Sequence, residues 1–185
     1  VANLLRGLLK LVQRAENDML TGVLNKKTME KRVSLMLKNR GDKYVIFYMV
    51  DLDNFKNVND TLGHIYGDQA IVETAQCLNK VFANQDCIGR LGGDEFAVCV
   101  SYQAFDEQGL LEFIGKKAQE ICAGNRRTYT DNAASVSITS SIGVAYAPDM
   151  GDSFTELYTQ ADCALYYSKA NGKDQYHIYS PKDDN

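Results

Sequence analysis

The chain has 185 residues, of which 45% are hydrophobic and 24% charged, and its formal net charge at pH 7 is −4. This length predicts one domain with an appendage, and the apolar content is sufficient for a sizeable core. The acidic balance argues against a nucleic-acid partner, which would require a basic face.

The sequence shows no run of about 18 apolar residues, as a membrane-spanning helix would need, and no secretory signal. The five cysteines lie in apolar stretches without CxxC or Cys/His spacing, so we expect free thiols in a reducing compartment. We therefore predict a cytoplasmic domain with no membrane contact of its own. A membrane anchor of the full-length protein would lie outside this stretch.

Residues 1–17 predict an amphipathic helix. Its apolar stripe consists of Leu4, Leu5, Leu8, Leu11, Val12 and Ala15. The spacing suits either a coiled-coil seam or packing on the same domain. Because the chain begins with valine, we expect anchoring or sensing parts upstream.

The next stretch alternates turns, helices and one strongly apolar strand. Asp18–Asn25 predicts a polar turn, and Lys26–Arg40 an amphipathic helix ending at a glycine. Tyr44–Val50 predicts a strand buried on both faces, which runs directly into two aspartates. Asp53–Gly63 predicts a short helix, whose first backbone N–H groups could bind phosphate.

The rest of the chain predicts three more helices and a hairpin. The helices are expected over Tyr66–Ala83, over Phe105–Ala123 with Gly124 as its stop, and over Phe154–Ala170 with Asp152 or Ser153 as its cap. The hairpin joins Cys87–Leu91 to Phe96–Val100, because paired glycines between two apolar runs favour a tight turn. Asn125–Ala134 is expected to be a polar loop, and Ser135–Ala145 and Gln175–Tyr179 to be strands.

Carboxylates gather at two of these predicted positions. Asp51 follows the buried strand, and Asp94 and Glu95 lie at the tip of the hairpin. Magnesium is usually held by one or two carboxylates together with waters and substrate phosphates. Asp51 and Asp94 therefore predict a magnesium–nucleotide site. An EF-hand is excluded, because Lys56 and Leu62 occupy its glycine and glutamate positions.

Five linked motifs resemble the GGDEF family, the diguanylate cyclases. They begin with Asp18-x-Leu20-Thr21-Gly22-x-x-Asn25, Asp51-x-Asp53-x-Phe55-Lys56-x-x-Asn59-Asp60 and Gly63-His64-x-x-Gly67-Asp68, and continue with Gly92-Gly93-Asp94-Glu95-Phe96 and Ala161-Asp162-x-Ala164-Leu165-Tyr166-x-x-Lys169-x-x-Gly172-Lys173. The resemblance covers about residues 18–180. It implies an α+β fold with a ferredoxin-like βααββαβ core, a central mixed sheet and flanking helices. The expected domains are a linker helix over 1–17, a GGDEF domain over 18–180 and a tail over 181–185.

The resemblance also implies an activity, in which two GTP molecules condense into cyclic di-GMP with release of pyrophosphate. Asp51, Asp94 and Glu95 match catalytic positions, and with the Leu52 carbonyl they match the ligands of Mg²⁺ or Mn²⁺. The implied substrate contacts are Asn59 and Asp68 for guanine, and Asn54, Phe55, Lys56, Lys169 and Lys173 for the rest of the nucleotide.

Structural alternatives to these roles remain open at several positions. Asp53 and Asp68 could cap helices, and lysines at the end of a helix complement its dipole without any ligand. Glu95 matches a residue that either binds metal or helps to deprotonate the attacking hydroxyl. Arg90 is either a surface charge or a phosphate neighbour.

The reaction joins two substrates, so we expect a homodimer of GTP-bound domains, controlled by an upstream sensory domain through the N-terminal helix. Many family members carry an inhibitory RxxD motif before the hairpin. Here Asp86 is kept but Ala83 replaces the arginine, so the inhibitory site is degenerate. The alternative to an active cyclase is a catalytically silent GTP-binding regulatory module.

Overall fold

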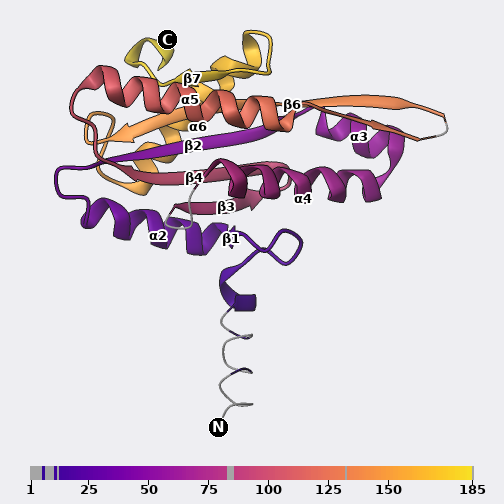
Figure 1. Ribbon diagram of the computed structural model, residues 1–185, viewed down its shortest axis with the longest axis horizontal. Helices are drawn as coiled ribbons and strands as arrows, with labels where there is room; N and C mark the ends of the chain where they lie inside the picture. Colours follow the sequence, from indigo (N-terminus) through magenta and orange to yellow (C-terminus); the bar gives the residue numbers. More distant parts are fainter. Residues whose placement is uncertain (1–5, 7–10, 12, 83–85, 132, 185) are drawn as a thin grey trace.

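A mixed sheet with helices on both faces forms the centre of the structure (Figure 1). The computed structural model describes residues 6, 11, 13–82, 86–131 and 133–184, and the elements below are those of this part of the chain. The strands are β1 (Leu24–Asn25), β2 (Tyr44–Asp53), β3 (Cys87–Gly92), β4 (Glu95–Tyr102), β5 (Arg127–Thr130), β6 (Ser135–Ala147) and β7 (Tyr176–Ile178). The helices are α2 (Lys26–Lys38), α3 (Phe55–Leu62), α4 (His64–Val81), α5 (Glu107–Asn125) and α6 (Phe154–Ala170), followed by a 3₁₀ turn over Pro181–Asp184.

The apolar strand β2 lies in the middle of the sheet. The strand order is β1-β3-β4-β2-β6-β5, and β7 pairs with β6. β2 runs antiparallel to both of its neighbours, whereas β1 with β3 and β6 with β7 are parallel pairs. The succession β2, α3, α4, β3, β4, α5, β6 is the predicted ferredoxin-like βααββαβ core. The prediction of an α+β fold is confirmed.

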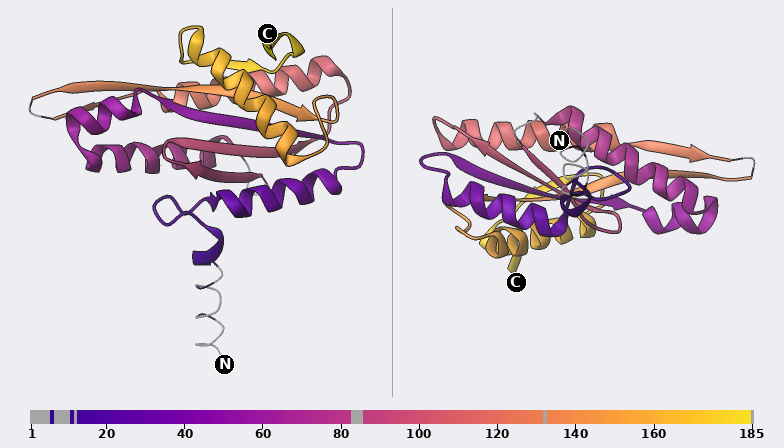
Figure 2. Two further views of the ribbon diagram at one scale, coloured as in Figure 1. Left: turned by 180° about the vertical axis from the view of Figure 1, so that it is seen from behind. Right: turned by 90° about the horizontal axis from the view of Figure 1, so that it is seen from below.

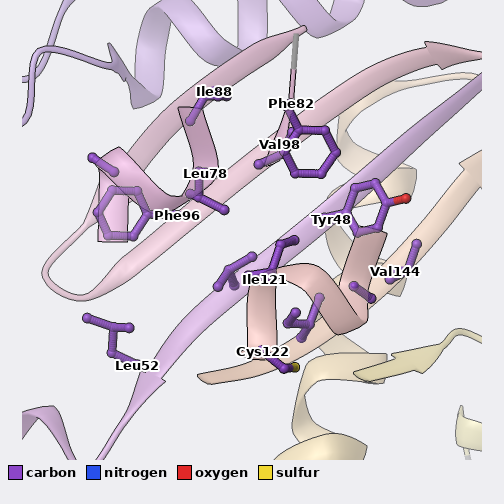
Figure 3. Close-up of a cluster of buried hydrophobic side chains, with 14 of the residues drawn as sticks. Tyr48, Leu52, Leu78, Phe82, Ile88, Phe96, Val98, Ile121, Cys122 and Val144 are labelled. Carbon is purple, nitrogen blue, oxygen red and sulfur yellow. The ribbon is translucent and has the colours of Figure 1, made fainter. Parts of the chain in front are cut away.

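Alternating residues of β2 face two separate hydrophobic clusters. Tyr48 and Val50 pack with residues of α4 and α5 on one face (Figure 3). Phe47 and Met49 pack with residues of α2 and α6 on the other face, and Figure 2 shows these two helices together on that side of the sheet. Successive side chains of a strand point to opposite faces. Asp51 therefore shares the face covered by α6.

Helix α6 lies unusually close to β6, at a glycine. A Cβ atom at Gly143 would collide with the carbonyl of Ala161 and the backbone of Leu165. Near the end of the helix, Ser168 Oγ donates a hydrogen bond of 2.8 Å to the carbonyl of Ile142. The last turn of α6 is therefore fixed against the sheet beside the end of β2.

The predicted loop over Asn125–Ala134 is wrong for residues 125–130. Helix α5 continues past Gly124 to Asn125, and β5 pairs antiparallel with residues 135–138 at the start of β6. Thr128 and Ser137 share a hydroxyl hydrogen bond of 3.0 Å across these strands. Such polar pairs stabilise a two-stranded arm but leave no apolar alternation in the sequence. The arm extends past α3 in Figure 1.

The N-terminal prediction lies mostly outside the described residues. Residues 13–16 are helical, and Leu11 is exposed, but Leu4, Leu5, Leu8 and Val12 are not described. The linker helix and the domain boundaries therefore stay predictions. None of the described helices is both long and apolar enough to cross a membrane.

Candidate active site

Two of the predicted catalytic carboxylates lie side by side at the end of the central strand. Asp51 and Glu95 are register partners on β2 and β4. Asp51 is only 7% exposed, and Lys169 Nζ from the end of α6 lies 2.9 Å from its Oδ2 atom. Asp94 is half-buried in the turn that precedes Glu95. The structure thus brings these three carboxylates and one lysine to the same end of the sheet.

The environment of Asp51 disfavours its charged form. Burial raises the pKa of this carboxyl to about 6 against the usual 3.8, although the hydrogen bond and charge of Lys169 act in the opposite direction. The negative charges of Asp94 and Glu95 raise the pKa further. Any additional positive charge close to Asp51 would therefore stabilise the charged form of its carboxylate.

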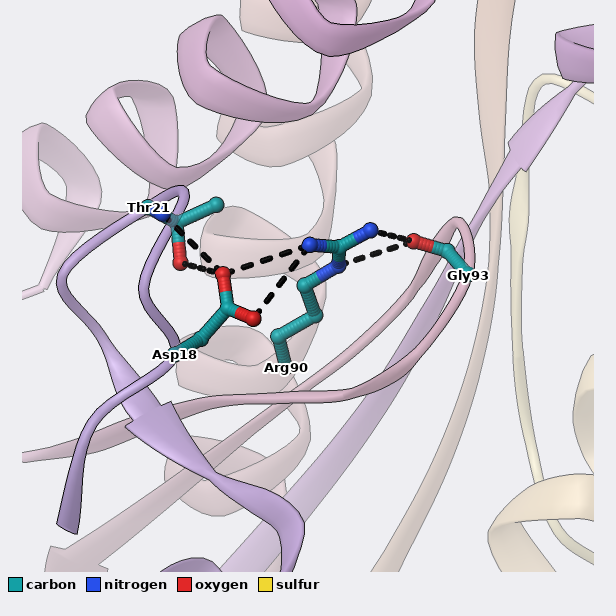
Figure 4. Close-up of polar contacts among 4 residues, drawn as sticks. All are labelled: Asp18, Thr21, Arg90 and Gly93. Carbon is teal, nitrogen blue, oxygen red and sulfur yellow. Dashed lines mark hydrogen bonds and ion pairs between the residues drawn. The ribbon is translucent and has the colours of Figure 1, made fainter. Parts of the chain in front are cut away.

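The hairpin turn that carries Asp94 is held by an arginine (Figure 4). Gly92 and Gly93 have φ values of +152° and +52°, which side chains disfavour. Arg90 donates two hydrogen bonds, of 2.8 and 2.7 Å, to the carbonyl of Gly93. It also forms an ion pair of 3.2 Å with Asp18. Arg90 thus mainly stabilises the turn. The sequence suggested either a surface charge or a phosphate neighbour, and neither alternative describes this role.

Asp18 connects Arg90 to the turn that precedes α2. Its Oδ1 atom accepts hydrogen bonds from the backbone N–H and the hydroxyl of Thr21, at 3.0 and 2.7 Å. These bonds and Arg90 hold the pKa of Asp18 below its usual value, in spite of partial burial. The polar motif over residues 18–25 is therefore joined to the hairpin both by this ion pair and by the pairing of β1 with β3.

Asp53 has a structural position but caps no helix. Its carboxylate accepts hydrogen bonds from Thr139 Oγ1 at 2.7 Å, Ser141 Oγ at 2.8 Å and the backbone N–H of Asp174 at 3.1 Å. The residue is 3% exposed and ends β2, while Asn54 occupies the N-cap position of α3. The alternative that Asp53 caps α3 is therefore wrong, because its carboxylate joins β2 to β6 and to the loop after α6.

The start of α3 faces that same loop. Asn54 has a left-handed φ of +63° and gives no side-chain cap to the helix. Its Oδ1 atom accepts a hydrogen bond of 3.2 Å from Lys173 Nζ. Phe55 packs against the hydrophobic cluster between the sheet and helices α4 and α5, and Lys56 is exposed. The first N–H groups of α3 therefore donate no hydrogen bond to the side chain at the N-cap. Two lysines lie close to them: Lys56 in the first turn of the helix and Lys173 in contact with Asn54.

The predicted guanine contacts lie at the corner between α3 and α4. A Cβ atom at Gly67 would collide with the side chain of Asn59, so the glycine permits close approach of the two helices. Asp68 follows Gly67 and is exposed. Helix α4 already begins at His64. The alternative that Asp68 caps this helix is therefore wrong.

The donor set at the end of β2 fits a magnesium ion that a nucleotide would complete. Among the described residues, no three His, Cys, Asp or Glu side chains are arranged to hold a metal on their own. Magnesium needs only one or two carboxylates when waters and phosphates supply the other oxygens. Asp51 meets that requirement, because Asp94 and Glu95 lie close enough to interact with its charge.

The fold and these motifs define an α+β domain of the nucleotide-cyclase type, and comparison with known proteins gives its family. The family model described as "Diguanylate cyclase, GGDEF domain" matches residues 15–175. The chain belongs to the GGDEF domain family. A solved structure of the coiled coil and GGDEF domain of DgcB from Caulobacter crescentus, in complex with c-di-GMP, superposes with a TM-score of 0.84 at 27% identity, covering 96% of this chain and 92% of that one.

Curated relatives carry mixed names. The bifunctional diguanylate cyclase/cyclic di-GMP phosphodiesterase MucR of Pseudomonas aeruginosa is 33% identical over 92% of this chain and 24% of its own length. The cyclic di-GMP phosphodiesterase PdeR of Escherichia coli is 30% identical over 91% of this chain and 24% of its own. The chain thus spans about a quarter of the length of these relatives.

Proposed function

We propose that this domain is an active diguanylate cyclase, which condenses two GTP molecules into cyclic di-GMP and releases two pyrophosphates. The observation that carries the proposal is the convergence of Asp51, Glu95 and Lys169 at the end of β2. A module that only bound GTP would have no need of a buried carboxylate poised beside two others. The GGDEF family membership supports the same reaction.

Each end of the substrate has residues of matching chemistry. Asp68 would accept hydrogen bonds from the N1–H and 2-amino edge of guanine, and Asn59 would pair with O6 or N3. Adenine offers no such donor edge, so it would leave the carboxylate unpaired. Lys169 and Lys173 would contact the triphosphate as point charges, and the uncapped start of α3 would supply backbone N–H groups.

The reacting centre would lie between these two regions. Mg²⁺ or Mn²⁺ at Asp51, Asp94 and the Leu52 carbonyl would supply charge stabilisation to the α-phosphate. Glu95 would either complete the oxygen ligands or accept the proton of the attacking 3′-hydroxyl. Asp51 would give the metal a fixed position, because it lies on the central strand β2.

The stoichiometry of the reaction requires two copies of the domain. One site holds one GTP, so a product that joins two nucleotides forms only where two sites face each other. We therefore propose a homodimer in the cytoplasm, brought together by an upstream sensory domain through the N-terminal helix. The structure with c-di-GMP that includes a coiled coil supports this arrangement by similarity.

A catalytically silent GTP-binding module is the second candidate. It is favoured by relatives that are named phosphodiesterases, although this chain matches only a quarter of their length. Incubation with GTP and Mg²⁺, followed by chromatography, separates the two functions. A cyclase yields cyclic di-GMP and pyrophosphate from GTP and none from ATP, whereas a silent module binds GTP in calorimetry and returns it unchanged.

A further inference from the structure

Lys169 is held on the same carboxylate that the proposed metal would use. Its Nζ atom lies 2.9 Å from Asp51 Oδ2, and the two side chains are 37% and 10% exposed. The lysine projects from the last turn of α6, which Gly143 and Ser168 fix closely against β6. The backbone that carries Lys169 is therefore fixed beside Asp51, whereas the long side chain is partly exposed and has room to change its partner.

An ammonium group and a divalent cation compete for one carboxylate. Both are positive, and their repulsion is strong at the short separation that a shared carboxylate imposes in a poorly solvated site. Asp51 is nearly buried, so water screens this repulsion less than at the surface. A divalent cation can thus bind tightly at Asp51 only when Lys169 has another partner.

We propose that Lys169 opposes metal binding at Asp51 until a triphosphate draws its ammonium group away. This inference rests on the proposed function. Phosphate oxygens offer Lys169 a partner of higher negative charge than one carboxylate. Nucleotide binding then frees the carboxylate, so metal and nucleotide bind with positive coupling. By linkage, each raises the affinity of the other by the same factor.

The second lysine of the site provides a matched control. Lys173 Nζ donates a hydrogen bond of 3.2 Å to the neutral Asn54 Oδ1 atom. Within the described part of the chain, it forms no ion pair with a carboxylate of the proposed metal site. Replacing Lys173 by methionine should weaken nucleotide binding without changing metal binding in the absence of nucleotide. Replacing Lys169 should change both.

The test measures Mn²⁺ binding to the full chain by electron paramagnetic resonance of free Mn²⁺, without nucleotide. Lys169→Met should bind Mn²⁺ more tightly than the wild type, by a factor of about 5 to 150, the usual range of coupling between sites. Lys173→Met should match the wild type. Equal or weaker Mn²⁺ binding by a folded Lys169→Met protein overturns the proposal.

The wild-type protein gives an independent test that needs no variant. A GTP analogue with a methylene bridge between its α and β phosphorus atoms should raise the affinity for Mn²⁺ beyond what chelation by the free analogue explains. Lack of this increase also overturns the proposal. Mn²⁺ binding that follows the expected pattern without any product from GTP would support the coupling and refute the cyclase activity.

Discussion

Replacing Asp51 by alanine should stabilise the fold at neutral pH, whereas the same change at Asp53 should destabilise it. The pKa of Asp51 is raised to about 6 against the usual 3.8. At 1.36 kcal/mol per pKa unit, this difference corresponds to about 3 kcal/mol of destabilisation by the charged carboxylate. Losing the small side chain costs about 1 kcal/mol in packing. We therefore expect Asp51→Ala to gain about 1 to 2 kcal/mol in unfolding free energy.

The stabilisation by Asp51→Ala should depend on pH. The native carboxyl keeps its proton up to about pH 6, while the unfolded chain releases it near its ordinary value of about 3.9. The native state thus binds more protons between these values, and wild-type stability falls as pH rises through about 4 to 6. Asp51→Ala lacks this decrease. Below about pH 4 its advantage should disappear.

Replacing Asp53 by alanine should lower the unfolding free energy, because the Asp53 carboxylate is held by hydrogen bonds. It accepts three hydrogen bonds, from Thr139, Ser141 and the backbone of Asp174. Alanine would remove them and leave one buried donor, on Ser141, and two partly buried donors unpaired, at a cost of roughly 3 to 5 kcal/mol in total. Urea unfolding of both variants in EDTA, at about pH 4 and pH 7, measures the two effects. Equal destabilisation by both changes would refute our separation of a functional from a structural aspartate.

Three further predictions concern turnover and ligands. Asp94→Ala should abolish cyclic di-GMP formation but change the unfolding free energy by only about 0.5 kcal/mol; normal turnover by the folded variant would exclude a metal ligand at this position. GTP should bind better than ATP in calorimetry, and Asp68→Ala should weaken GTP binding more than ATP binding; equal losses would exclude guanine recognition by this carboxylate. Micromolar cyclic di-GMP should not inhibit turnover through the degenerate motif, because Ala83 lacks the charged hydrogen bonds of arginine, worth roughly 1.5–3 kcal/mol each. Strong inhibition that survives Asp86→Ala would show that another surface binds the product.

The parts of the fold that local patterns determine could be predicted from the sequence. The run Tyr44–Val50 indicated the buried strand, and the paired glycines before Asp94 indicated the hairpin. Strand β5 was missed because Thr128 and Thr130 pair through hydroxyl groups, which look like a polar loop in the sequence. Its strand conformation depends on β6, which supplies both partners.

The contacts within the site were less predictable, because they join residues far apart in the chain. Asp53 is 86 residues from Thr139, and Arg90 is 72 residues from Asp18. Neither pair leaves a local signal of spacing or periodicity. The carboxylates themselves were found from the sequence, whereas the partner that each one uses required the three-dimensional arrangement.

The most direct measurement of the central claim is the initial rate of cyclic di-GMP formation from GTP and Mg²⁺ as a function of protein concentration. Two copies must meet to join two nucleotides, so the rate should rise more steeply than in proportion to protein wherever sedimentation shows monomers in excess. Product formed at a constant specific rate by a monomeric protein would contradict the two-copy mechanism. GTP that is bound but returned unchanged at every concentration would contradict the cyclase itself.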